Sequence, residues 1–229
     1  MVFQALEWAV VGFVVIAFSF LSFYRRALDL KGVLAAVIVG LLVYYLGGFS
    51  SFLVLVAAYV VMEWGTRYGR SITGKAHETR SIGNIAGNTF PALIALALNP
   101  GMLNAGFFGG LAAAMADTLS TEIGSLSGKR PVLITTFKEV EVGTDGGITL
   151  QGLVAGACGG LLMGVAFYFL SGKILALPLF AFVGLVGSMA DSVLGAVFER
   201  RGILNNTHVN FLASAVGVAL AGAMGTLLF

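Results

Sequence analysis

The sequence predicts an all-α protein, a polytopic membrane helix bundle with about eight transmembrane helices. Of its 229 residues, 58% are hydrophobic and only 10% are charged, whereas soluble domains carry about 25% charged residues. Its 32 glycines include one at every fourth position of residues 152–164, a pattern typical of a packing seam between membrane helices. We therefore expect residues 1–229 to form a single integral membrane domain in the lipid bilayer. The net charge of +2 does not indicate a nucleic-acid partner.

Eight apolar stretches approach the 17–25 residues that a helix needs to cross about 30 Å of hydrocarbon. Arg25 and Arg26 follow the first stretch without a small-residue cleavage pattern, so we expect a retained helix and not a signal peptide. Gly47 and Gly48 separate the second stretch from the third. The expected helices cover residues 4–24, 31–47, 50–68, 82–98, 103–126, 148–170, 174–198 and 209–228.

The basic residues predict the orientation of these helices. Twelve of the 13 lysines and arginines fall in the loops after the first, third, fifth and seventh helices, and only Lys173 falls on the other side. By the positive-inside rule these four loops are cytoplasmic and both termini lie outside. The expected location is the plasma membrane if the source is prokaryotic.

Two aspartates lie in matching contexts inside predicted membrane helices. The triplet Met-Ala-Asp ends at Asp117 and again at Asp191, with Gly110 and Gly184 seven residues before them. An aspartate at the bilayer centre costs about 2.5–3.5 kcal/mol, so an intramembrane carboxylate indicates a functional site. The predicted topology places both aspartates in the cytoplasmic halves of their helices, together with Glu122.

These carboxylates suit magnesium, which binds through one or two carboxylates, waters and substrate phosphates. We predict Asp117 and Asp191 as ligands. Glu122 is turned by about 140° from Asp117 on a regular helix, so it joins them only if the helix unwinds or Glu122 meets a neighbouring segment. The alternative is that each carboxylate faces a water-filled vestibule and bonds to its neighbours. Glu63 is expected to pair with Arg67, one helical turn further on.

Residues 127–147 form a basic, glycine-rich cytoplasmic loop that we predict to be part of an active site. Its basic side chains supply charge for phosphate oxygens, and the Gly-Thr-Asp-Gly-Gly turn lets backbone N–H groups approach an anion at the start of the next helix. The alternative is an ordinary positive-inside loop that ends in a capping residue. Three asparagines of the flanking helices are expected at the same level: Asn84, Asn88 and Asn210.

The sequence around these positions resembles an integral membrane family once labelled domain of unknown function 92, which includes a plant phytyl-phosphate kinase of vitamin E biosynthesis. The resemblance is carried by residues 116–124, 134–138 and 143–147 and covers most of the chain. The layout is also similar to that of dolichol and phytol kinases. Those enzymes have a Glu-Gly-Ser or Glu-Gly-Thr turn where this chain has Gly143-Thr144-Asp145-Gly146.

The resemblance implies phosphoryl transfer from a nucleoside triphosphate, CTP above all, to an isoprenoid monophosphate such as phytyl or geranylgeranyl phosphate. Asp117 and Asp191 would hold magnesium, with Glu122 assisting or acting as a base. The three asparagines would orient phosphate or metal-bound water, and the prenyl tail would lie among the helices. The remaining residues would bind the triphosphate: Arg80, Lys129, Arg130, Lys138, Thr144, Asp145 and Gly146.

Two other functions are compatible with the sequence. A cytidylyltransferase would use the same metal and nucleotide to make a CDP-lipid. A transporter is the second alternative, although inverted repeats are typical of that class and the two Met-Ala-Asp copies run in the same direction through the membrane. Nothing in the sequence selects between a monomer and a dimer.

Overall fold

The computed structural model describes residues 2–74, 79 and 81–228 and is built almost wholly from helices. Its elements are α1 (Val2–Tyr24), α2 (Leu30–Thr73), α3 (Ile82–Leu98), α4 (Ala105–Gly124), β1 (Val132–Leu133), β2 (Gly147–Ile148), α5 (Leu150–Ser171), α6 (Ala176–Leu194), η1 (Gly195–Glu199) and α7 (Asn206–Leu228). The predicted all-α class is confirmed. The two short strands pair antiparallel at the base of the loop between α4 and α5.

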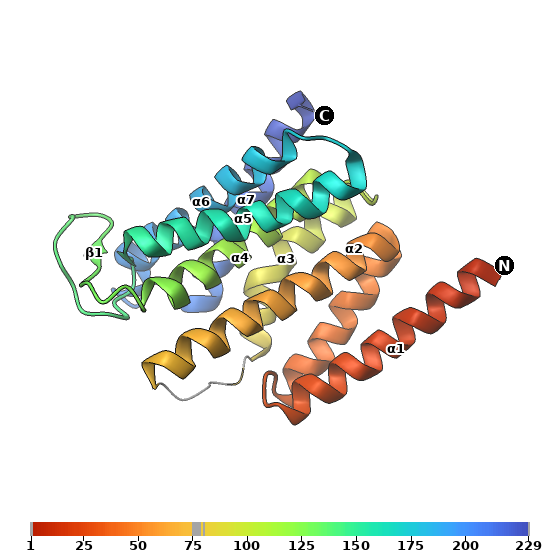
Figure 1. Cartoon of the computed structure of the whole chain (residues 1–229), viewed down its shortest axis with the longest axis horizontal. Coiled ribbons are helices and arrows are strands. Elements are labelled where there is room, and N and C mark those ends of the chain that lie inside the picture. Colours follow the sequence, from red (N-terminus) through yellow and green to blue (C-terminus); the bar gives the residue numbers. More distant parts are fainter. Residues whose placement is uncertain (1, 75–78, 80, 229) are drawn as a thin grey trace.

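Helix α2 consists of two arms that fold back on one another at Gly48 (Figure 1). Gly48 has φ 76° and ψ −176°, a conformation that a residue with a β-carbon rarely adopts. The arms correspond to the expected helices 31–47 and 50–68, but the second arm continues to Thr73, five residues beyond the expected end. It is stabilised near that end by the expected ion pair, in which Arg67 Nε lies 2.6 Å from Glu63 Oε1.

Five helices in the described part of the chain are long and apolar enough to cross a membrane: α1, α2, α5, α6 with η1, and α7. Their outward faces expose large apolar side chains, such as Phe13 and Ile16 of α1. Helix α3, with 17 residues, is apolar but shorter. The expected eight crossings stay a prediction, in which the arms of α2 cross separately and α3 and α4 cross within the bundle.

Helix α4 forms the centre of the bundle, and α5, α6 and α7 pack around it. Thirteen of its 20 residues are buried, a larger share than in any other helix. The predicted glycine seam of α5 is confirmed. Gly152 and Gly156 lie against the backbone of α4, while Gly160 and Gly164 lie against the backbone of α6.

The two Met-Ala-Asp copies lie on parallel, adjacent helices. A β-carbon on Gly184 of α6 would lie 3.1 Å from the carbonyl oxygen of Ala112, and one on Gly187 would lie 3.0 Å from Cα of Ala113. The two helices therefore run in the same direction, and both aspartates lie at the same end of the bundle. Helices α1, α2 and α4 and the turn η1 all end at this end of the bundle, away from the fold-back of α2 and the short α5–α6 connection (Figure 1). That this end faces the cytoplasm, with both termini outside, stays a prediction from the positive-inside rule.

Candidate functional site

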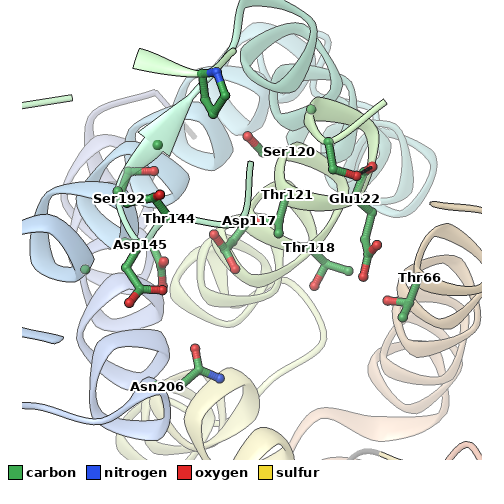
Figure 2. A pocket seen from close by; sticks show the side chains of 18 of the residues that line it. Thr66, Asp117, Thr118, Ser120, Thr121, Glu122, Thr144, Asp145, Ser192 and Asn206 are labelled. Atoms are coloured by element: carbon green, nitrogen blue, oxygen red, sulfur yellow. Dashed lines mark hydrogen bonds between the residues drawn. The ribbon is translucent and has the colours of Figure 1, made fainter. Parts of the chain in front are cut away.

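A polar cavity of about 390 Å³ lies at the end of the bundle that holds Asp117 and Asp191. It is enclosed by α2, α3, α4, α6, η1, α7 and residues 142–147 of the loop before α5. Helix α4 supplies much of its wall, because about three turns of buried residues without polar side chains give way to a polar stretch beginning at Asp117. Figure 2 shows Asp117 in the middle of the cavity, with Thr144, Asp145 and Ser192 on one side and Thr118, Glu122 and Thr66 on the other.

The carboxyl groups of Asp117 and Asp191 lie close together in the cavity and interact directly with one another. Asp191 Oδ2 is buried and has no hydrogen-bond partner within the described part of the chain. Glu199 and Asp145 lie within electrostatic reach of Asp191. Two ionised carboxylates repel one another at close range, so such a pair is stabilised by a shared proton or by a cation between them.

Glu122 occupies a different part of the cavity from the aspartate pair. Helix α4 stays regular as far as Gly124, so Glu122 points toward α2, where Arg70 Nε lies 3.9 Å from its Oε1. Both side chains are largely buried, at 21% exposed for Arg70 and 16% for Glu122. Glu122 therefore meets a neighbouring segment, which was one of the two conditions under which we expected it to join the aspartates. That segment, however, places the cationic side chain of Arg70 next to it.

The glycine-rich turn of the loop closes one side of the cavity. Thr144, Asp145 and Gly146 all line it, and Gly146 lies against the end of α6 with φ 79°. Directly after α6 the backbone widens into the π-helical turn η1, which ends at Glu199 on the cavity wall. Single π-helical turns are found frequently at functional sites.

Three asparagines complete the arrangement that the sequence predicts. Asn84 and Asn88 are one turn apart on α3, and Asn210 lies near the start of α7; all three line the cavity. Asn84 also accepts a hydrogen bond from the backbone N–H of Ser81 at 2.9 Å and so caps its own helix. Asn88 and Asn210 are buried.

The predicted basic residues of the loop are not brought to the cavity wall. Lys129 and Lys138 are exposed, and Arg130 forms an exposed ion pair with Glu141, with Nη2 3.7 Å from Oε1. Neither these lysines nor Arg130 lines the cavity. Arg80 lies outside the described residues. The loop therefore contributes its glycine-rich turn, and its phosphate-binding role through these side chains stays a proposal.

Several cavity residues were not anticipated from the sequence. Arg70 is the one basic side chain among the described residues of the wall. Its position two turns after Glu63 on the same helix is the sequence feature that could have indicated it. Ser192 follows Asp191 as Thr118 follows Asp117, so the repeat already marked both hydroxyls. No such pattern marks most of the remaining polar residues, which are Thr66, Thr73, Thr79, Ser120, Thr121, Ser125, Glu199 and Asn206.

The donor set fits a magnesium ion that is shared with a phosphorylated ligand. Five carboxylates line the cavity against one described arginine: Asp117, Glu122, Asp145, Asp191 and Glu199. Within residues 2–74, 79 and 81–228, no three His, Cys, Asp or Glu side chains converge on one point where they could hold an ion by themselves. Magnesium does not need three, because it usually keeps waters and takes one or two carboxylates plus phosphate oxygens. Asp117 and Asp191, with the partnerless Oδ2, are the pair that fits.

The fold and the cavity define a multi-pass membrane protein with an acidic, polar site at one end of its helix bundle. The sequence matches the family described as integral membrane protein DUF92 over residues 13–218, and the chain belongs to this family. The resemblance noted from the motifs is thereby confirmed. No solved structure matches the chain.

Relatives in this family come from archaea, cyanobacteria and plants. An uncharacterized membrane protein of Methanocaldococcus jannaschii is 40% identical over 210 residues, which cover 89% of this chain and 87% of that protein. An uncharacterized membrane protein of Synechocystis is 29% identical over 202 residues, covering 80% of this chain and 77% of its own length. Protein VTE6, chloroplastic, of Arabidopsis thaliana is 29% identical over 224 residues, covering 85% of this chain and 64% of the plant protein.

Proposed function

We propose that this protein is a prenyl-phosphate kinase, which transfers a phosphoryl group from a nucleoside triphosphate such as CTP to an isoprenoid monophosphate. Membership of a family that includes the plant protein VTE6 supports a kinase of this kind. The observation that carries the proposal is the contact between Asp117 and Asp191 inside the polar cavity. A carboxylate pair in this place suits polyphosphate chemistry, because magnesium bound there would neutralise charge on the phosphates.

The proposed reaction places few demands on the protein beyond positioning. An oxygen of the lipid monophosphate attacks the γ-phosphorus, and the bond from that phosphorus to the β-phosphate oxygen breaks. The products are a lipid diphosphate and a nucleoside diphosphate. Phosphoryl transfer depends mainly on alignment and on stabilising charge on the transferred group. A phosphate monoester has its second pKa near 6, so at neutral pH the acceptor oxygen is already ionised and needs no strong base.

The individual residues take the following roles in this proposal. Asp117 and Asp191 hold magnesium. Arg70, held by Glu122, supplies positive charge to the phosphate groups, so Glu122 acts by positioning Arg70 and not as a base. Asn88 and Asn210 donate amide hydrogen bonds to phosphate oxygens, while the Gly143–Gly147 turn closes the site around the nucleotide.

Product analysis in detergent or lipid nanodiscs tests the proposal. The purified protein is incubated with geranylgeranyl, phytyl or farnesyl monophosphate, one of the four nucleoside triphosphates labelled on the α- or γ-phosphate, and magnesium or EDTA. With the γ-labelled nucleotide, we expect a labelled lipid diphosphate and an unlabelled nucleoside diphosphate. An α-labelled CDP-lipid with release of pyrophosphate would instead identify a cytidylyltransferase. Absence of magnesium-dependent product with every pair of substrates would overturn the enzymatic proposal.

A further inference from the structure

A second, apolar groove lies beside the polar cavity. It encloses about 60 Å³ between α1, the two arms of α2 and α3. Its wall is formed by aliphatic and aromatic side chains, among them Phe18 of α1, Ala36 of the first arm of α2, and Val56 and Tyr59 of the second arm. Phe18 and Tyr59 meet edge to face, with ring centroids 4.8 Å apart.

The groove and the polar cavity share two residues, Asn84 and Asn88 of α3. These side chains stand one helical turn apart, so one face of α3 borders both spaces. A molecule that occupied both would pass from the carboxylate-lined cavity to aliphatic walls at these two amides. That sequence of environments matches a phosphate group followed directly by a hydrocarbon chain.

The place of the groove also suits a ligand that arrives from the membrane. Helix α1 lies at the edge of the bundle and packs chiefly against α2 (Figure 1). Only 11% of its most apolar stretch is buried in the protein, so the outer side of the groove faces lipid. A hydrocarbon chain enters between α1 and α2 without leaving the apolar phase, whereas its phosphate stays with the polar residues.

We infer that this groove holds the isoprene units nearest the phosphate of the lipid monophosphate, with the phosphate between Asn84, Asn88 and the cavity. This inference rests on the proposed function and adds the site of the lipid tail. The groove is short, so the distal part of a long chain lies along α1 in the lipid. It follows that the enzyme discriminates weakly between chains that differ only at their far end.

Two matched substitutions on the second arm of α2 test the inference. Val56 lines the groove, while Val60, one turn further on, is 54% exposed and does not line the groove. The probe is geranylgeranyl monophosphate that carries a diazirine on the isoprene unit next to the phosphate, photolysed with the protein in nanodiscs. In the unmodified protein we expect labelled peptides from α1, α2 and α3. Val56→Trp is expected to reduce this labelling at least tenfold, and Val60→Trp to leave it within twofold.

Nucleotide binding is measured in the same samples, because it reports whether the fold and the polar cavity are intact. Magnesium–CTP is expected to bind both variants with unchanged affinity. If Val56→Trp does not fold, Ala36→Leu fills the same groove with a smaller side chain, and Ile38→Phe on the lipid-facing side is its control. Labelling spread over the outer faces of α5 and α7, or equal labelling of the groove variant and its control, would overturn the inference.

The outcome is separable from that of the proposed function. Specific labelling of the groove without formation of lipid diphosphate would retain the groove as a lipid-phosphate site and overturn the kinase. Formation of lipid diphosphate by a Val56→Trp enzyme with unchanged KM for the lipid would retain the kinase and overturn the groove.

Discussion

Gly146 packs directly on Ser192: a β-carbon at position 146 would lie 2.6 Å from the Ser192 carbonyl oxygen. This contact seats the glycine-rich turn on α6, one residue from Asp191. Because the obstacle is backbone, it cannot move aside as the end of a flexible side chain would.

Gly146→Ala is therefore expected to displace the turn and to lower turnover at least tenfold. The φ of 79° adds strain of about 1–2 kcal/mol for a residue with a β-carbon. Gly128→Ala, in the same loop, is the control, since Gly128 also has a positive φ, 66°, but open space around its α-carbon. Kinetics and thermal unfolding of the two variants separate the effect of strain from that of the contact. Equal activity of both variants would show that docking of the turn is not required.

The aspartate pair leads to a prediction about magnesium. Asp117→Asn and Asp191→Asn are each expected to lower turnover about a hundredfold or more, because charge stabilisation by a catalytic metal is worth several kcal/mol. They should also raise the magnesium concentration needed for half-maximal nucleotide binding. Titrations of bound CTP against magnesium, made alongside the kinetics, measure both effects.

Glu141→Gln is the matched control for these charge changes. Its exposed pair with Arg130 belongs to a class of ion pairs worth about 0–1 kcal/mol, so activity and magnesium dependence are expected to stay unchanged. Full magnesium-dependent activity in Asp117→Asn would contradict the assigned role of the pair.

Arg70 is expected to matter more for nucleotide binding than the basic residues of the loop. Arg70→Gln should raise the KM for the nucleotide about tenfold or more, since a hydrogen bond to a charged group is worth about 1.5–3 kcal/mol. Lys129→Gln, Arg130→Gln and Lys138→Gln should change it less than twofold, because none of these side chains lines the cavity. The reverse order would mean that the loop moves onto the nucleotide when it binds.

The role assigned to Glu122 is tested with the same assay. If Glu122 positions Arg70, Glu122→Gln weakens nucleotide binding in the native background but has little additional effect in the Arg70→Gln background. If Glu122 acts as a base instead, Glu122→Gln lowers turnover, and it does so whether or not Arg70 is present. The double-mutant cycle distinguishes the two cases.

The glycine seam of α5 leads to a prediction about stability. A β-carbon on Gly160 would meet the carbonyl oxygen of Phe180 and lie 3.0 Å from Cα of Gly184. Gly160→Ala is therefore expected to destabilise the protein by about 1–3 kcal/mol, as overpacking typically does. Gly222→Ala, on the open side of α7, should change stability by less than about 0.5 kcal/mol. Thermal unfolding in detergent measures both, and equal melting temperatures would refute the seam.

Much of the fold could be predicted from composition and periodic spacing. Long apolar stretches, the glycine break at Gly48 and the repeat around Asp117 and Asp191 are local patterns, and each specifies a helix, a fold-back or a marked residue without reference to the rest of the chain. The resemblance to the family also depended only on such patterns. Most of the residues that carry chemistry in the proposal could therefore be picked out from the sequence, whereas Arg70 was not anticipated.

Which of these residues meet was decided by tertiary packing. Asp117 and Asp191 are 74 positions apart, and they touch because small residues let α4 and α6 run in parallel at close approach. Glu122 is separated from Asp117 by helical geometry, which the sequence predicted, but its partner Arg70 depends on how α2 folds back. The basic residues of the loop at positions 127–147 have side chains that suit phosphate. The position of a loop is not set by periodic packing, however, and this loop is anchored to the bundle through Gly146. Sequence patterns record what each segment buries; only the packed helices determine which polar ends share one cavity.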